Sequence, residues 1–259
     1  MTDEATVDRV HPSSDPVELL TFLRRPLSAA PDIVPRIVLR RGLTVIRASP
    51  LDGLMLALNL TLARSAGLPW LGRPTAPGIT LVLTVADKDE LTWRVRAMRR
   101  ALTQPAVPDS VFLMPDRGCK PDTPAGLEAL TAALEVSRAD CLVLDSAVRL
   151  RSGPMLGLVS AIDALIQRHH LAVVITHHRG GGRETRALLD AAQRVVSLEQ
   201  DGAGWMLEAG RPDNPALIDR LPMTRARDTH WFTPFTATPA VPNSAASSAP
   251  EPTPAKAGV

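Results

Sequence analysis

The chain has 259 residues, enough for one α/β domain with a sizeable core or at most two small domains. Apolar residues make up 45% of it, which indicates a globular protein rather than a disordered one. The formal net charge is only +2, so bulk charge alone does not indicate a polyanionic partner. Aromatic residues make up 3%, which argues against a surface for stacking single-stranded bases.

Cellular location follows from three further observations. Two cysteines suit a reducing compartment and indicate neither a disulfide framework nor a metal site. The first fifteen residues are acidic and polar, unlike a signal peptide. No apolar run reaches the length of a membrane span. We therefore expect a cytoplasmic protein without membrane contact.

Changes in composition divide the chain into three parts. Residues 1–40 are expected to form an N-terminal segment, with a short helix near residues 16–27. A core domain is expected over residues 41–235. From residue 236 the chain is rich in Pro, Ala and Ser, and residues 236–259 are expected to be a disordered tail.

Within the core, short apolar runs that suit strands alternate with longer segments that suit helices. Strands are predicted at residues 43–47, 79–85, 111–114, 141–145 and 171–176. Helices are predicted at residues 53–66, 89–102, 123–136 and 154–169. A hairpin is predicted over residues 194–209. This order predicts an α/β fold: a mainly parallel sheet flanked by helices and closed by a C-terminal antiparallel hairpin.

The stretch from Leu43 to Gly67 suits a short strand, a tight loop and a helix that is apolar almost all the way round. This is the frame of a P-loop, Gly-x-x-x-x-Gly-Lys-Ser/Thr, whose backbone N–H groups hold phosphates at a helix N-terminus. When the chain is aligned on Gly53, Leu54 stands at the Lys position and Met55 at the Ser/Thr position. The first Gly position is Ala48, so the frame is present without its phosphate-binding side chains.

Two interpretations of this loop are open: a nucleotide site that works through its backbone alone, or a scaffold turn. Asp52 favours the turn, because it puts a negative charge where phosphate would lie. At about 5 Å and an effective dielectric of about 20, the repulsion is roughly 3 kcal/mol per unit charge. Pro50 also restricts a loop that needs free N–H groups. We predict a degenerate nucleotide site, weak or non-binding, at Ala48, Gly53, Leu54, Met55 and Asp145.

Several polar residues follow predicted strands, and the carboxyl ends of parallel strands meet at one edge of a sheet. Ala48, the pair Ala86-Asp87, Asp145 and the pair His177-His178 are therefore expected to cluster. Asp145 is either a Mg²⁺ ligand or a structural carboxylate, and the lack of further ligands favours the second. The two histidines are either a metal or nucleotide-sensing pair or structural. Neighbours on an extended backbone point in different directions, which favours a structural role.

Four segments, in this order, resemble the RepA-like branch of the RecA-type P-loop ATPases, the hexameric helicases of broad-host-range plasmids. They are ARSAGLPWLGRP (63–74), LVLTVADKDELTWRVRAM (81–98), CLVLDSAVRL (141–150) and SGPMLGLVSAIDALIQRHHLAVVITHHRGGG (152–182). The resemblance runs from about residue 31 to residue 211 and implies a RecA-like fold. It places the water-activating Glu of the family on Ala86, its Walker B carboxylate on Asp145 and its arginine finger on Gln193 or Arg194.

The joint loss at Leu54, Met55 and Ala86 favours a catalytically inactive homologue that needs no cofactor. The resemblance implies an accessory or scaffold role in DNA replication, repair or recombination. The expected partners are an active ATPase, a polymerase or a recombinase, in a homo- or hetero-oligomer. One alternative is an active helicase subunit, using ATP and Mg²⁺, that a neighbouring protomer completes. Another is an interaction module unrelated to DNA.

Two arginine-rich segments bear on the choice of partner. Residues 179–186 (RGGGRETR) place Arg179, Arg183 and Arg186 among glycines, in what we interpret as a loop. This loop either contacts the phosphates of single-stranded DNA or is a solvated mobile loop. The arginines from Arg94 to Arg100 are interpreted as a solvated helix face or a subunit contact.

Overall fold

The computed structural model describes residues 32–100, 102, 110–115, 118–178, 182–202, 204–211, 214–229 and 231–234. The helix predicted at residues 16–27 and the tail predicted from residue 236 lie outside the described residues. The side chains of residues 33, 34, 37 and 38 are fully buried in the core.

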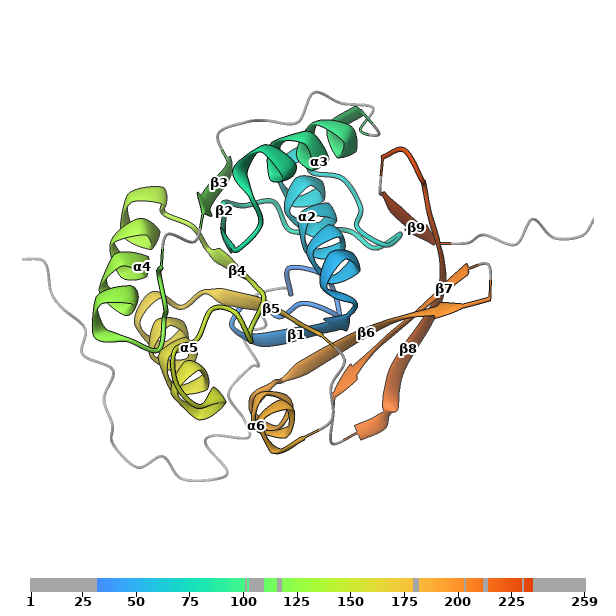
Figure 1. The fold of residues 1–259 in the computed structure, drawn as a ribbon. Coiled ribbons are helices and arrows are strands. Elements are labelled where there is room, and N and C mark those ends of the chain that lie inside the picture. The colour runs from blue at the N-terminus through green and yellow to red at the C-terminus, as the bar shows by residue number, and fades with distance from the viewer. Residues whose placement is uncertain are drawn as a thin grey trace, which may run out of the picture. The chain divides into compact units, whose positions relative to one another are not determined.

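The described strands form one sheet in the order β3-β2-β4-β5-β1-β6-β7-β8-β9 (Figure 1). The strands from β3 to β6 in this order are parallel, and β7, β8 and β9 continue the sheet antiparallel. This confirms the predicted α/β fold with a mainly parallel sheet. The parallel strands are β1 (Gly42–Ala48), β2 (Thr80–Thr84), β3 (Val111–Pro115), β4 (Cys141–Asp145), β5 (Ala172–His178) and β6 (Arg194–Asp201). The antiparallel strands are β7 (Gly204–Arg211), β8 (Asn214–Arg225) and β9 (Phe232–Pro234).

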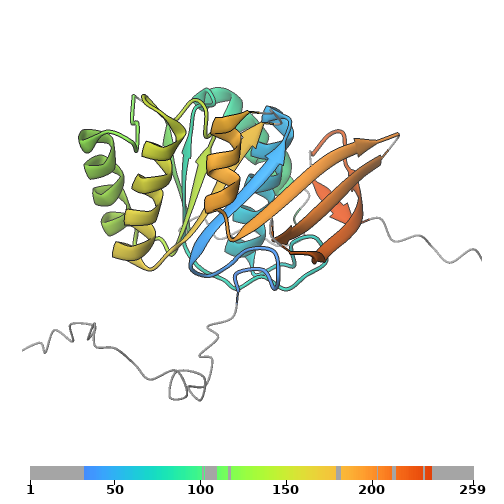
Figure 2. The same cartoon turned by 90° about the horizontal axis from the view of Figure 1, so that it is seen from below.

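Helices cover both faces of the sheet, and the sheet separates two apolar cores (Figure 2). The first core lies under α2 (Pro50–Ala66) and α3 (Lys88–Arg100). The second lies under α4 (Pro124–Ser137), α5 (Met155–His169) and α6 (Arg183–Ala191). None of the helices in the described residues is long and apolar enough to cross a membrane.

Helix α2 is buried from Asp52 to Arg64, which confirms the prediction of a helix that is apolar almost all round. It ends at Gly67, whose φ of 63° is the left-handed conformation that glycine adopts without strain. Its start differs from the prediction: the helix begins at Pro50 rather than at Gly53, because Ser49 serves as the N-cap.

The interpretation of residues 179–186 as a loop is wrong for its second half. Residues 183–191 form helix α6, which packs through the fully buried Leu188 onto the second core. The segment RETRALLDA is amphipathic, but its short length and the preceding glycines hid it in the sequence. Arg183 and Arg186 therefore lie on a helix, and Arg179 lies outside the described residues.

Candidate functional site

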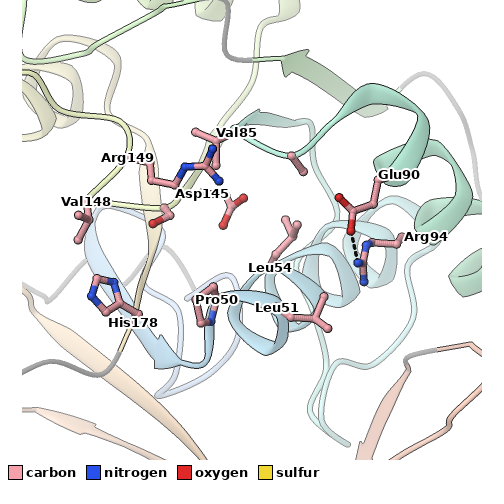
Figure 3. A pocket seen from close by; sticks show the side chains of 12 residues that line it. Pro50, Leu51, Leu54, Val85, Glu90, Arg94, Asp145, Val148, Arg149 and His178 are labelled. Atoms are coloured by element: carbon pink, nitrogen blue, oxygen red, sulfur yellow. Dashed lines mark hydrogen bonds and ion pairs between the residues drawn. The ribbon is translucent and has the colours of Figure 1, made fainter.

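A cavity of about 500 Å³ lies at the carboxyl ends of β1, β2, β4 and β5, and we call it the strand-end cavity (Figure 3). Its position and size are typical of ligand sites in open α/β sheets. The strand ends that were predicted to cluster do meet here. The cavity is lined by Pro50, Leu51, Leu54, Val85, Ala86, Glu90, Arg94, Asp145, Ser146, Val148, Arg149 and His178.

The loop from β1 to α2 is reduced to one residue, Ser49, and this changes what the loop can bind. The backbone N–H of Asp52 donates to the Ser49 hydroxyl at 3.2 Å, and that of Gly53 donates to the Ser49 carbonyl at 2.9 Å. Pro50 has no N–H. A P-loop needs several N–H groups pointing at phosphate. Here Pro50 lacks the group, and those of Asp52 and Gly53 are used by the start of the helix.

Asp52 is held by the C-terminal strands. Its side chain is only 8% exposed, accepts a hydrogen bond from the Ser49 hydroxyl and forms an ion pair with Arg225 of β8. The guanidinium of Arg225 lies 4.9 Å from the ring centroid of Trp205 and 5.9 Å from that of Phe232. Because Arg225 balances its charge, Asp52 repels phosphate less than the isolated charge considered in the sequence would.

The side chains at the Lys and Ser/Thr positions lie in different surroundings. Leu54 lines the strand-end cavity and gives it an apolar wall (Figure 3). Met55 is fully buried against α3, where its sulfur lies 3.8 Å from Nη1 of Arg94. Arg94 in turn pairs with Glu90 at the edge of the cavity. Ala48 and Gly53 supply the end of β1 and the first turn of α2.

Asp145 ends β4 and is 4% exposed at the cavity wall. Its two oxygens accept hydrogen bonds from the hydroxyls of Thr84 at 2.9 Å and Thr176 at 2.8 Å. Burial raises the pKa of Asp145 above its usual value, while these bonds and the nearby Arg149 act in the opposite direction. The sequence analysis missed both threonines, although each stands at or near the carboxyl end of its strand.

A comparison with protein families decides the membership of the chain. A family model described as an AAA domain matches residues 15–184, more than half of the chain and every strand end around the cavity. The chain belongs to this family of RecA-like P-loop ATPases. No curated protein matches the chain. Strands β6 to β9 follow the matched part of the AAA domain, so Arg225, which holds Asp52, comes from outside it.

His177 and His178 point in different directions, as predicted. His177 is 3% exposed, and its Nε2 lies 3.1 Å from the hydroxyl of Thr185 on α6. His178 lines the strand-end cavity, and the two ring centroids are 5.1 Å apart. The described residues contain no group of three or more side chains placed to hold a metal ion.

The pKa of His177 is lowered to about 4 by burial and by the positive charges of His178, Arg47 and Arg151. Below about pH 6.5 the unfolded chain takes up a proton here that the folded AAA domain does not. We expect the free energy of unfolding to fall as the pH is lowered from about 6.5 to about 4. Urea unfolding at several pH values should show a shallower fall for His177→Asn.

Asp145 changes the free energy of unfolding in the opposite direction as the pH is lowered, so the His177→Asn variant is needed for comparison. Its raised pKa favours folding at low pH, and this contribution is lost as the pH rises through its folded value. The difference between wild type and His177→Asn therefore isolates the histidine. Equal slopes for the two proteins over this pH window would contradict the prediction.

Of the other predicted site residues, Arg183 and Arg186 of α6 lie on the face of the sheet opposite α2. The side chain of Arg186 is 82% exposed and lies 3.8 Å from Asp190. At the position implied for an arginine finger, the Gln193 side chain accepts from the Leu43 N–H at 2.6 Å, and Arg194 donates to backbone carbonyls. These groups are therefore separate from the strand-end cavity.

Proposed function

We propose that this AAA domain is a member of the RepA-like branch that does not hydrolyse ATP. Its role would be that of an accessory or scaffold protein in DNA replication, repair or recombination. The observation that carries the proposal is the start of α2, which begins at Pro50 with Leu54 facing the strand-end cavity. A site that begins in this way offers a triphosphate neither the backbone cradle of a P-loop nor its Lys.

Three catalytic groups of a P-loop ATPase are missing here. Leu54 stands in place of the Lys that contacts the β- and γ-phosphates. Met55 stands in place of the Ser/Thr whose hydroxyl holds Mg²⁺, and its side chain is buried against α3. The base position is Ala86. Asp145 is retained, but its oxygens accept hydrogen bonds from Thr84 and Thr176. Loss of even one transition-state contact typically reduces the rate by about 10²–10³.

The role at DNA rests on membership of the family, which is an analogy at the level of the fold. The exposed Arg183 and Arg186 support it, because guanidinium groups on a surface helix suit phosphate contacts. An active ATPase, a polymerase, a recombinase or a second copy of the chain would be the protein partner. The cavity is mostly apolar, which suits a protein without a nucleotide cofactor.

The proposal predicts that the purified full chain neither binds nor hydrolyses ATP. Phosphate release should be measured with Mg²⁺ and ATP, with and without single-stranded DNA, and ATP binding by titration calorimetry. We expect no release above that of Asp145→Asn and no heat of binding at about 1 mM ATP, which corresponds to less than about 4 kcal/mol of binding free energy. Turnover that Asp145→Asn abolishes would overturn the proposal and favour an active subunit instead.

A further inference from the structure

A second, smaller cavity of about 310 Å³ lies beside α3, and we call it the α3 cavity. Its volume is at the lower end of the range of about 300–1000 Å³ for ligand pockets, so it suits one flat group. The described residues around it differ from those of the strand-end cavity. They are Asp89, Thr92, Trp93, Arg96, Ala97, Arg100 and Asp228, the last from the turn between β8 and β9.

Trp93 is unusual among the tryptophans of the chain. It is 59% exposed, whereas Trp70 is 1% exposed, and an indole ring in water leaves a large apolar area uncovered. Arg96 and Arg100 follow Trp93 at three and seven residues, so the three side chains share one stripe of the helix. Leu91 and Met98 face the core instead.

The charge on this part of α3 is positive. Within the part of the chain that the structure describes, Arg96, Arg99 and Arg100 are exposed and form no ion pair. The neighbouring Arg94 pairs with Glu90. Cations in a last helical turn are stabilised by the helix dipole, which accounts for a basic terminus but not for the exposed indole ring beside it.

We propose that Trp93, Arg96, Arg99 and Arg100, which we call the α3 surface, bind single-stranded nucleic acid. One base stacks on Trp93, and the backbone phosphates lie against the three arginines. An indole face accepts any base, and guanidinium groups neutralise phosphates. The small share of aromatic residues excludes an extended stacking platform, but a site for one base needs a single ring.

The acidic residues of the α3 cavity decide between two kinds of polyanion. Asp89 and Asp228 lie at its wall and would repel the carboxylates of an acidic peptide. The same carboxylates accept hydrogen bonds from the amino groups of bases. The base therefore fits beside Trp93, and the phosphates are directed to the last turn of α3. The inference rests on the proposed role at DNA and not on the loss of hydrolysis.

The test is fluorescence anisotropy with a labelled single strand of mixed sequence, about 20 nucleotides long, at several salt concentrations. Stacking is worth about 1–3 kcal/mol per base, so Trp93→Ala should weaken binding about tenfold, and Trp93→Phe should weaken it less. Each phosphate contact contributes about 0.7 to the salt slope of single strands. Arg96→Ala combined with Arg100→Ala should therefore reduce the slope by about 1.4.

Matched variants make the outcomes distinct. Arg168→Ala removes an exposed arginine from α5, on the opposite face of the sheet, and should leave binding unchanged. Arg183→Ala with Arg186→Ala reports on α6 separately. The inference alone would be overturned if the α3 variants bound the labelled strand as tightly as the wild type does. It would also be overturned if polyglutamate displaced the labelled strand as readily as unlabelled DNA does. Failure of the wild-type chain to bind would overturn the role at DNA as well, and neither result bears on ATP hydrolysis.

Discussion

Arg64→Met should lower the free energy of unfolding by about 3 kcal/mol, the low end of the range for breaking a buried ion pair. Arg64 has no exposed side-chain surface. Its guanidinium donates to the Ala76 carbonyl at 3.0 Å, to the Thr80 hydroxyl at 3.0 Å and to both oxygens of Asp140 at 2.9 Å. Methionine keeps much of the volume but leaves these acceptors without their donor. Asp140 is 38% exposed, so water offsets part of the loss.

Urea unfolding followed by circular dichroism measures this effect, with Arg168→Met as the control. Arg168 pairs with Glu135 at 3.2 Å, but its side chain is 64% exposed. Exposed pairs contribute about 0–1 kcal/mol, so this variant should unfold almost as the wild type does. Equal losses for the two variants would show that Arg64 is not acting through its buried contacts.

Gly78 offers an independent test of the same interaction. A Cβ atom at this position would lie 2.1 Å from Nη2 of Arg64 and 2.6 Å from Oδ1 of Asp140. Gly78→Ala must therefore separate the pair and should lower stability by a similar amount. Because both changes disrupt the same interaction between Arg64 and Asp140, the double variant should lose less stability than the sum of the losses of the two single variants. Strictly additive losses would contradict this account.

The parallel half of the fold was predictable because its signals are local. Continuous apolar runs mark strands covered on both faces, and Thr123 with Pro124 marks the start of α4. Strands β8 and β9 were missed for a physical reason: β8 contains Pro215 and Pro222, which argue against a strand in the sequence, and β9 has only three residues. Proline is tolerated near a sheet edge, and a short strand depends on its partner rather than on its own sequence.

The site was only partly predictable. The alignment with the P-loop and the order of the strands correctly placed Leu54, Ala86 and Asp145 around one cavity. The sequence did not reveal that α2 starts at Pro50, because the cap depends on where β1 ends. Nor did it reveal the partner of Asp52, because Arg225 is 173 residues away. Contacts of this kind are set by the pairing of the whole sheet and leave no local pattern.

Arg225→Met should lower the free energy of unfolding by about 2–3 kcal/mol, because it leaves the carboxylate of Asp52 buried without its cation. The Asp52 side chain is 8% exposed. The N-terminus of α2 and the Ser49 hydroxyl offset part of this loss, since both stabilise a negative charge there. Loss of the contact with the Trp205 ring adds about 0.5–1 kcal/mol.

A double-mutant cycle with Asp52→Asn, measured by urea unfolding, isolates the pair. Asp52→Asn should cost only about 1 kcal/mol, because the amide oxygen still accepts from the Ser49 hydroxyl and the Arg225 side chain is already 27% exposed. The coupling energy should be about 1–2 kcal/mol. Arg220→Met on the same strand is the control, because Arg220 pairs with Glu208 at 2.9 Å but is 73% exposed. Additive effects of the two changes would contradict a direct ion pair.

The double variant also separates two obstacles to phosphate binding. It removes the negative charge of Asp52 but keeps Pro50, the Ser49 cap and the bond from the Gly53 N–H to the Ser49 carbonyl. If the helix start closes the site, Asp52→Asn with Arg225→Met should still show no heat of binding with Mg²⁺ and ATP. Binding gained by this variant alone would mean that the ion pair between Asp52 and Arg225, and not the shortened loop, keeps phosphate out.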